Sequence, residues 1–143
     1  MSLEQKRYIG FLGTWSLDPA SCVYEQGSPP QEGIYHIDDR DGVLHFLIDW
    51  VDADGKQQRV SFSGVPNGEK IPFSGAPLAD AMSVDAPSES ELISAAYWQS
   101  ESCMVATRTL SSSGRVMHVV QMVRLPDGTE LRNQSTYFKN ALA

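Results

Sequence analysis

The sequence predicts an all-β protein: a single antiparallel up-and-down barrel of about eight to ten strands, preceded by a short N-terminal helix. Segments rich in β-branched and aromatic residues recur along the chain, and glycine-containing turns separate them. Helical patterns are too short to connect parallel strands, so the sheet should be antiparallel. An uncovered meander of this many strands avoids two exposed edges only by closing on itself. With 143 residues, the chain has the length of one domain, and we expect residues 1–143 to form a single barrel.

The expected elements follow one another in chain order. Ser2 and Gln5 have capping-box spacing, which predicts a short helix with Tyr8, Ile9 and Leu12 on one face. A weak strand is expected around Trp15. The clearer strands are predicted at 31–38, 42–52, 57–63, 91–98, 102–110, 115–124 and 129–139, with a single helical turn at 77–82 and a weaker strand at 82–85.

The turns are marked by dipeptides whose residues tolerate positive φ, and Asn-Gly and Asp-Gly are typical of type I′ turns. They are Asp41-Gly42, Asp54-Gly55, Asn67-Gly68, Ser113-Gly114 and Asp127-Gly128. The strand at 42–52 shows the clearest period of two, with Leu44, Phe46, Ile48 and Trp50 on one face.

Charge and cysteine usage narrow the choice of partners and compartment. Eighteen acidic and 11 basic residues give a net charge of −7, which disfavours binding to nucleic acid or to an anionic membrane. No apolar run is long enough to insert into a membrane, and the first residues do not form a signal peptide. Cys22 and Cys103 are far apart in sequence, and we expect two separate thiols in a reducing cytoplasm. The chain is expected to be a monomer or a homodimer.

Four stretches carry a resemblance to a known family. Gly13-Thr14-Trp15 at the first strand resembles the start of lipocalin and fatty-acid-binding barrels. The later stretches are Pro72-Phe73-Ser74-Gly75-Ala76-Pro77, Thr107-Arg108-Thr109-Leu110-Ser111 and Arg132-Asn133-Gln134-Ser135-Thr136-Tyr137. Together they resemble a family of lipocalin-like, calycin-type bacterial domains with an N-terminal GTW motif, which has no agreed activity.

This resemblance covers nearly the whole chain and implies the lipocalin-like barrel. It also implies that Trp15 closes one end of the barrel and packs against an arginine from a late strand, for which Arg108 and Arg132 are the candidates.

Motifs for catalysis and for cofactors are missing from the sequence. His36, His45 and His118 have no spacing typical of a metal site, and the start of a calcium loop at 52–55 lacks its closing glutamate. Nucleophile elbows and phosphate-binding loops are also absent. We therefore expect no metal, no cofactor and no assigned catalytic residue.

Polar residues within predicted strands are the candidates for ligand binding. Asn133, Ser135 and Tyr137 alternate and share one strand face. Arg108 suits a carboxylate or another anion, to which Tyr137 could add a hydroxyl group. The full set of candidate ligand-binding residues is Arg108, His118, Tyr137, Asn133, Ser135, Phe46, Trp50 and Tyr97.

The favoured hypothesis is non-catalytic binding of a small hydrophobic or amphipathic ligand, with an anionic ligand as one option, inside the barrel. One alternative is a small enzyme of the isomerase, cyclase or hydratase type that uses His118 or Tyr137 as its acid or base. Another is an interaction module with a solid interior. The alternation of residues leaves open which strand face points inward.

Overall fold

The computed structural model describes residues 7–72 and 79–140. Within these residues, ten antiparallel strands form one sheet, in the order β4-β3-β2-β1-β10-β9-β8-β7-β6-β5. The strands are β1 (Gly13–Tyr24), β2 (Glu32–Arg40), β3 (Val43–Val51), β4 (Gln57–Gly64), β5 (Ile71–Pro72), β6 (Ala81–Ser88), β7 (Glu91–Trp98), β8 (Glu101–Leu110), β9 (Val116–Arg124) and β10 (Glu130–Lys139).

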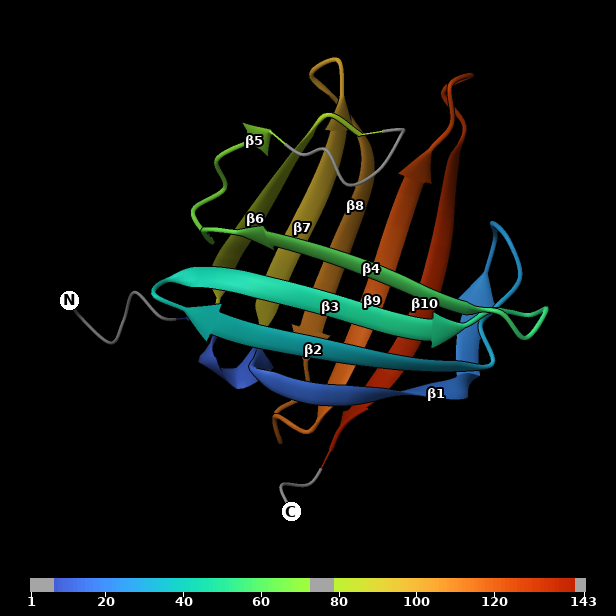
Figure 1. Cartoon of the computed structure of the whole chain (residues 1–143), viewed down its shortest axis with the longest axis horizontal. Helices are drawn as coiled ribbons and strands as arrows, with labels where there is room; N and C mark the ends of the chain where they lie inside the picture. Colours follow the sequence, from blue (N-terminus) through green and yellow to red (C-terminus); the bar gives the residue numbers. More distant parts are fainter. Residues whose placement is uncertain (1–6, 73–78, 141–143) are drawn as a thin grey trace.

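The sheet bends into a nearly closed barrel, as the sequence predicts. Strands β1 to β4 cross strands β6 to β10 as two layers (Figure 1). The first and last strands meet, since β1 pairs with β10 from Trp15 opposite Lys139 onward. The two ends of the sheet are β4 and β5. Beside them, a bridge between Asn67 and Asp85 and a hydrogen bond of 2.8 Å from Gly68 N to Val84 O draw the chain after β4 against β6.

The seven clearer strands lie within two residues of their predicted bounds, and the predicted turn glycines have positive φ. Asp41 also has a positive φ, of 55°, as a type I′ turn requires. The turn at Gln99 and Ser100 has positive φ at both residues without a glycine. Because this turn contains no glycine, no glycine dipeptide marks it in the sequence.

The helical predictions fit less well. Residues 1–6, which carry the proposed capping box, lie outside the described residues, and the described helix is the short 3₁₀ helix η2 (Ile9–Phe11). The predicted turn at 77–82 is wrong at its end, because Ala81 and Met82 belong to β6 and pair with β7. Residues 77 and 78, like most of the 72–77 motif, lie outside the described residues. None of the described helices is long and apolar enough to cross a membrane.

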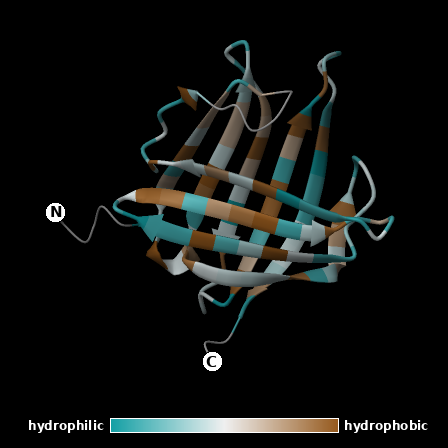
Figure 2. Ribbon diagram, viewed as in Figure 1, coloured by the Kyte–Doolittle hydropathy of each residue, from teal (hydrophilic) through white to brown (hydrophobic). Residues whose placement is uncertain are grey.

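One end of the barrel is filled by buried apolar side chains. Hydrophobic and hydrophilic residues alternate along the strands (Figure 2). Trp15 is fully buried there among Phe11, Leu44 and Leu92, and its Nε1 donates a hydrogen bond of 2.9 Å to Phe11 O. The cation over its ring is Lys139, at 5.4 Å from the ring centroid. The expected packing of Trp15 against Arg108 or Arg132 is therefore corrected, because Lys139 lies directly opposite Trp15 on the paired strand.

Candidate ligand cavity

A cavity of about 890 Å³ occupies the barrel interior beyond this apolar end. Its volume lies within the range typical of small-molecule sites. The outer part of the cavity is lined by residues at the ends of strands and in the loops that connect β1 to β2, β3 to β4 and β9 to β10. These residues are Gln26, Ser28, Pro30, Trp50, Asp52, Trp98, Leu125 and Pro126. The barrel is thus packed at one end and hollow toward the other.

Arg108 is the charged group deepest in the lining, with 1% of its surface exposed. It projects from the inner face of β8, and its guanidinium donates hydrogen bonds to Ser94 Oγ at 3.0 Å and to Tyr35 Oη at 3.3 Å. Its Cζ atom lies 5.0 Å from the Phe46 ring centroid and 5.3 Å from that of Tyr35. Two neutral hydroxyls and two aromatic rings therefore surround this cation.

Within the described part of the chain, no carboxylate neutralises Arg108. The ion pairs there are Arg40–Asp38 and Arg59–Asp49, both near the surface. The Arg108 Nε atom is also buried without a hydrogen-bond partner among these residues. Buried charges are usually paired, because removing a charge from water is costly. Among the described residues, the buried Arg108 guanidinium thus lacks an anion that would offset the cost of removing its charge from water.

The predicted face of β10 points inward, with Asn133, Ser135 and Tyr137 buried along the cavity. The Tyr137 ring meets the Tyr35 ring edge-on, with centroids 4.9 Å apart. Burial, with the neighbouring Tyr35, raises the pKa of Tyr137 well above its ordinary value. A Cβ at Gly33 would lie 3.4 Å from Tyr137 Oη, so the glycine leaves room for this hydroxyl.

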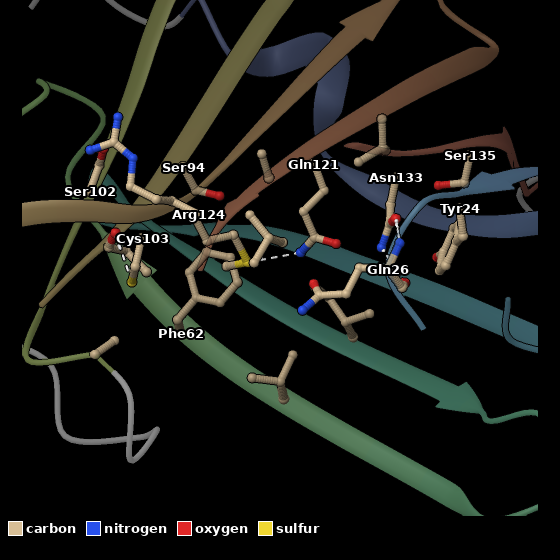
Figure 3. A pocket seen from close by; sticks show the side chains of 18 of the residues that line it. Tyr24, Gln26, Phe62, Ser94, Ser102, Cys103, Gln121, Arg124, Asn133 and Ser135 are labelled. Atoms are coloured by element: carbon tan, nitrogen blue, oxygen red, sulfur yellow. Dashed lines mark hydrogen bonds between the residues drawn. The ribbon is translucent and has the colours of Figure 1, made fainter. Parts of the chain in front are cut away.

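Asn133 is held by the backbone of the β1–β2 loop. Its Oδ1 accepts hydrogen bonds of 3.0 Å from the N–H groups of Glu25 and Gln26, and its Nδ2 donates one of 3.1 Å to Gln26 O. Figure 3 shows Asn133 beside Gln26, with Tyr24 and Ser135 nearby. Asn133 therefore positions the loop that carries Gln26 into the cavity lining.

The structure brings together five of the eight candidate binding residues: Trp50, Arg108, Asn133, Ser135 and Tyr137 line the cavity. Phe46 lies outside the lining, with its ring against the Arg108 guanidinium. Tyr97 and His118 face the other side of the sheet. Tyr97 hydrogen-bonds Ser83 at 3.0 Å beneath Lys70, while the exposed His118 contacts Thr136 at 3.3 Å.

Strand parity explains why the sequence misplaced Tyr97. The inward residues of β7 include Ser94, Ala96 and Trp98, so Trp98 rather than Tyr97 lines the cavity. A β-bulge opposite Ala96 and Tyr97 adds one residue to β8 at this point, which is Cys103. The Cys103 thiol also lines the cavity and donates a hydrogen bond of 3.4 Å to Ala96 O.

Sequence reasoning missed several polar residues of the site. Tyr35 and Ser94, the hydrogen-bond partners of Arg108, lie at alternate positions of predicted strands, and the period of two could have placed them once the inner face was known. Tyr24 and Gln26 carry no such signal, because β1 contains an irregularity between Asp18 and Val23 that changes its register. Gln121 lies on the face of β9 opposite to His118.

Both cysteines lie in the described part of the chain, and neither forms a disulfide. Burial and the nearby Asp18 raise the pKa of the Cys22 thiol. Among the described residues, no three histidine, cysteine or acidic side chains gather as a metal site.

No protein-family model and no curated protein matches the sequence significantly. Among solved structures, the chain is similar to the zebrafish ileal bile acid-binding protein complexed with cholic acid. The TM-score is 0.51 at 12% identity, covering 92% of this chain and 99% of that chain. Bovine odorant-binding protein, complexed with its natural ligand, gives a TM-score of 0.48 at 12% identity, covering 100% of this chain and 76% of that chain. At such identity the likeness to the zebrafish protein concerns the fold, which is a lipocalin-like barrel.

Proposed function

We propose that this protein binds a small amphipathic carboxylate inside its barrel without transforming it, and that Arg108 holds the carboxylate. The observation that carries the proposal is the buried Arg108 guanidinium, which has hydrogen bonds only to neutral hydroxyls and an Nε atom without a partner in the described structure. An anionic head group would satisfy both the charge and the remaining donors.

The surrounding side chains suit the rest of such a ligand. Beyond Arg108 the cavity is walled by Ile48, Val60, Phe62 and Met82, which would cover a hydrocarbon body. The proposed head-group site comprises Arg108, Ser94, Tyr35 and Tyr137, with Phe46 supporting the guanidinium and Trp50 near the mouth. The zebrafish protein of similar fold is complexed with cholic acid, itself a carboxylic acid with an apolar body, which agrees with a ligand of this class.

The acid/base alternative has less support. His118 is exposed on the outer side of the sheet, away from the cavity lining. Burial raises the pKa of Tyr137 and keeps its hydroxyl protonated near neutral pH, which argues against its use as a general base there. A hollow interior also gives less support to an interaction module with a solid barrel.

Several wider predictions from the sequence stay proposals. They are the bacterial origin and GTW family suggested by the motif resemblance, a cytoplasmic location, and a monomeric or homodimeric state. The net charge of −7 continues to favour a small ligand over nucleic acid.

Titration calorimetry with laurate and 1-dodecanol tests the function, because the two probes share a chain length and differ in head-group charge. Hydrogen bonds to charged groups contribute about 1.5–3 kcal/mol, so we expect Arg108→Met to weaken laurate binding by a factor of about ten or more. Dodecanol should bind equally to both proteins.

The matched control is Arg40→Met, which removes an exposed arginine that pairs with Asp38. Circular dichroism establishes that both variants fold. Unchanged laurate affinity in Arg108→Met contradicts the proposal, and so does a wild type that binds neither laurate nor a polycyclic carboxylate such as cholate. Native mass spectrometry of protein purified without denaturation adds a direct search for a retained ligand.

A further inference from the structure

The two sides of the cavity differ in polarity. Strand register places Tyr24 on β1 opposite Asn133 on β10, and Asn133 opposite Gln121 on β9, so these three side chains form one row across adjacent strands. Ser135 and Tyr137 continue the polar side deeper along β10. In Figure 3, Gln121, Asn133, Ser135 and Tyr24 lie together on one side, while Phe62 lies apart from them.

The opposite side is apolar. Ile48 on β3 is paired with Val60 on β4, and Phe62 follows on β4 with its ring stacked on Phe46 at a centroid distance of 4.5 Å. Met82 and Ala96, on the paired strands β6 and β7, extend this surface. None of these side chains carries a hydrogen-bonding group stronger than a thioether.

The polar side offers groups that the protein leaves available. Within the described residues, the side-chain hydroxyls of Tyr24, Ser135 and Tyr137 take part in none of the hydrogen bonds. Among the residues that the structure describes, the Gln121 amide donates only to the Met104 thioether, a weak acceptor, at 2.9 Å. Burial raises the pKa of Tyr24 to about 12, so its hydroxyl stays protonated and can both donate and accept.

A flexible alkyl chain would not use this arrangement. Laid along the polar side, its methylene groups would remove water from these hydroxyls and the amide without replacing the lost hydrogen bonds. A rigid ring system with hydroxyl groups on one face would direct those groups to the polar side and its bare face to Ile48, Val60 and Phe62. Rigidity also lowers the entropy lost on binding.

We infer that the preferred ligand is a rigid polycyclic carboxylate with hydroxyl groups along one face, rather than a straight-chain fatty acid. The hydroxylated face lies against Tyr24, Gln121 and Ser135, and the bare face lies against the apolar wall. This inference deepens the proposed function and rests on it for the placement of the carboxylate at Arg108.

The test compares cholate, whose hydroxyl groups share one face of its rings, with 5β-cholanate, which has the same skeleton and carboxylate without them. A hydrogen bond contributes about 1 kcal/mol net, so Tyr24→Phe and Ser135→Ala should each weaken cholate binding about fivefold by calorimetry. The affinities for cholanate and laurate should stay within about twofold of the wild type, since neither probe bonds these groups.

Two control variants remove hydroxyl groups that do not line the cavity. Tyr97→Phe acts on the other side of β7, and Thr136→Val acts on the strand position next to Ser135; both should bind cholate like the wild type. Unchanged cholate affinity in both Tyr24→Phe and Ser135→Ala overturns the inference. So does an equal loss for cholanate, or the absence of cholate binding to the wild type.

Arg108→Met separates this inference from the proposed function. If the variant binds all carboxylates as well as the wild type while the hydroxyl dependence persists, the head-group site fails and the two-sided ligand class survives. If Arg108→Met weakens every carboxylate while Tyr24→Phe and Ser135→Ala change none, the proposed function stands and the ligand class inferred here is wrong.

Discussion

Among single residues, Arg108 is the buried cation of the cavity, and its burial lowers the stability of the fold. A buried cation without an anion loses the favourable interactions of its charge with water. The hydrogen bonds to the Ser94 and Tyr35 hydroxyls replace only part of these interactions. Such a cost is typical of functional groups, which are retained for binding rather than for folding. A carboxylate bound as proposed would offset this cost, and ligand affinity and folding stability would then be coupled at Arg108.

Two tyrosines of the cavity lining, the half-buried Tyr24 and the buried Tyr137, predict how stability depends on pH. The pKa of Tyr24 is raised by burial from 10.0 to about 12, and that of Tyr137 is raised in the same direction. Both tyrosines lose their protons more readily in the unfolded chain. Their contribution to stability is therefore complete below about pH 10 and is lost as the pH rises toward the folded values.

We accordingly expect the urea midpoint to fall between about pH 10 and pH 12, and to fall less steeply in Tyr137→Phe and Tyr24→Phe. Urea denaturation followed by circular dichroism at a series of pH values measures this. If the urea midpoint fell with rising pH as steeply in both variants as in the wild type, these hydroxyls would not govern the loss of stability at alkaline pH.

At the scale of elements, the seam between β4 and β6 depends on one close approach. The Asn67–Asp85 bridge holds the chain after β4 against β6 there, and Gly64 packs directly against Val84. A Cβ at Gly64 would lie 2.8 Å from Val84 Cγ2, closer than two carbon atoms can pack. Because valine has a stiff side chain, the strands themselves would have to move apart.

Gly64→Ala should therefore lower the free energy of unfolding by about 1–3 kcal/mol, the usual cost of overpacking. The cost should shrink in a Val84→Ala background, which removes the clashing methyl group. Urea denaturation of both single variants and the double variant measures this coupling. If the free-energy costs of Gly64→Ala and Val84→Ala were strictly additive, the contact between these two residues would not limit how closely β4 approaches β6.

In the molecule as a whole, the two ends of the barrel are packed differently. The end around Trp15 is fully packed, with η2 against it, whereas the other is hollow and has Trp50 in its lining and Trp98 at 47% exposure. The apolar core and the proposed binding cavity thus occupy opposite ends of one sheet.

The three tryptophans can report on these ends separately. Laurate should change the tryptophan fluorescence of the wild type, and the change should be lost in a Trp50→Phe, Trp98→Phe double variant, which keeps the buried Trp15. Calorimetry on the same variant establishes whether laurate still binds. A full fluorescence response from the double variant, with binding intact, would place the ligand at the packed end instead.

Much of this fold is local and could be derived from the sequence. Alternation along each strand and the residues of each turn are short-range properties, and pairing between consecutive strands adds contacts that are close in the chain. The strand at 91–98 was predicted with its observed bounds for this reason. The closure of β1 onto β10 also followed, because a long meander without helices has few other ways to cover its edges.

The amino-acid pattern alone was enough to predict seven of the ten strands closely, their antiparallel succession, and the shared face of Asn133, Ser135 and Tyr137. Which face points inward follows from packing between the layers of the barrel, and for this reason His118 and Tyr97 lie outside the cavity whereas Trp98 and Tyr24 line it. The reason is physical: alternation has two equivalent solutions, and long-range packing between layers chooses one. The same packing left the interior hollow and Arg108 without an anion in the described chain.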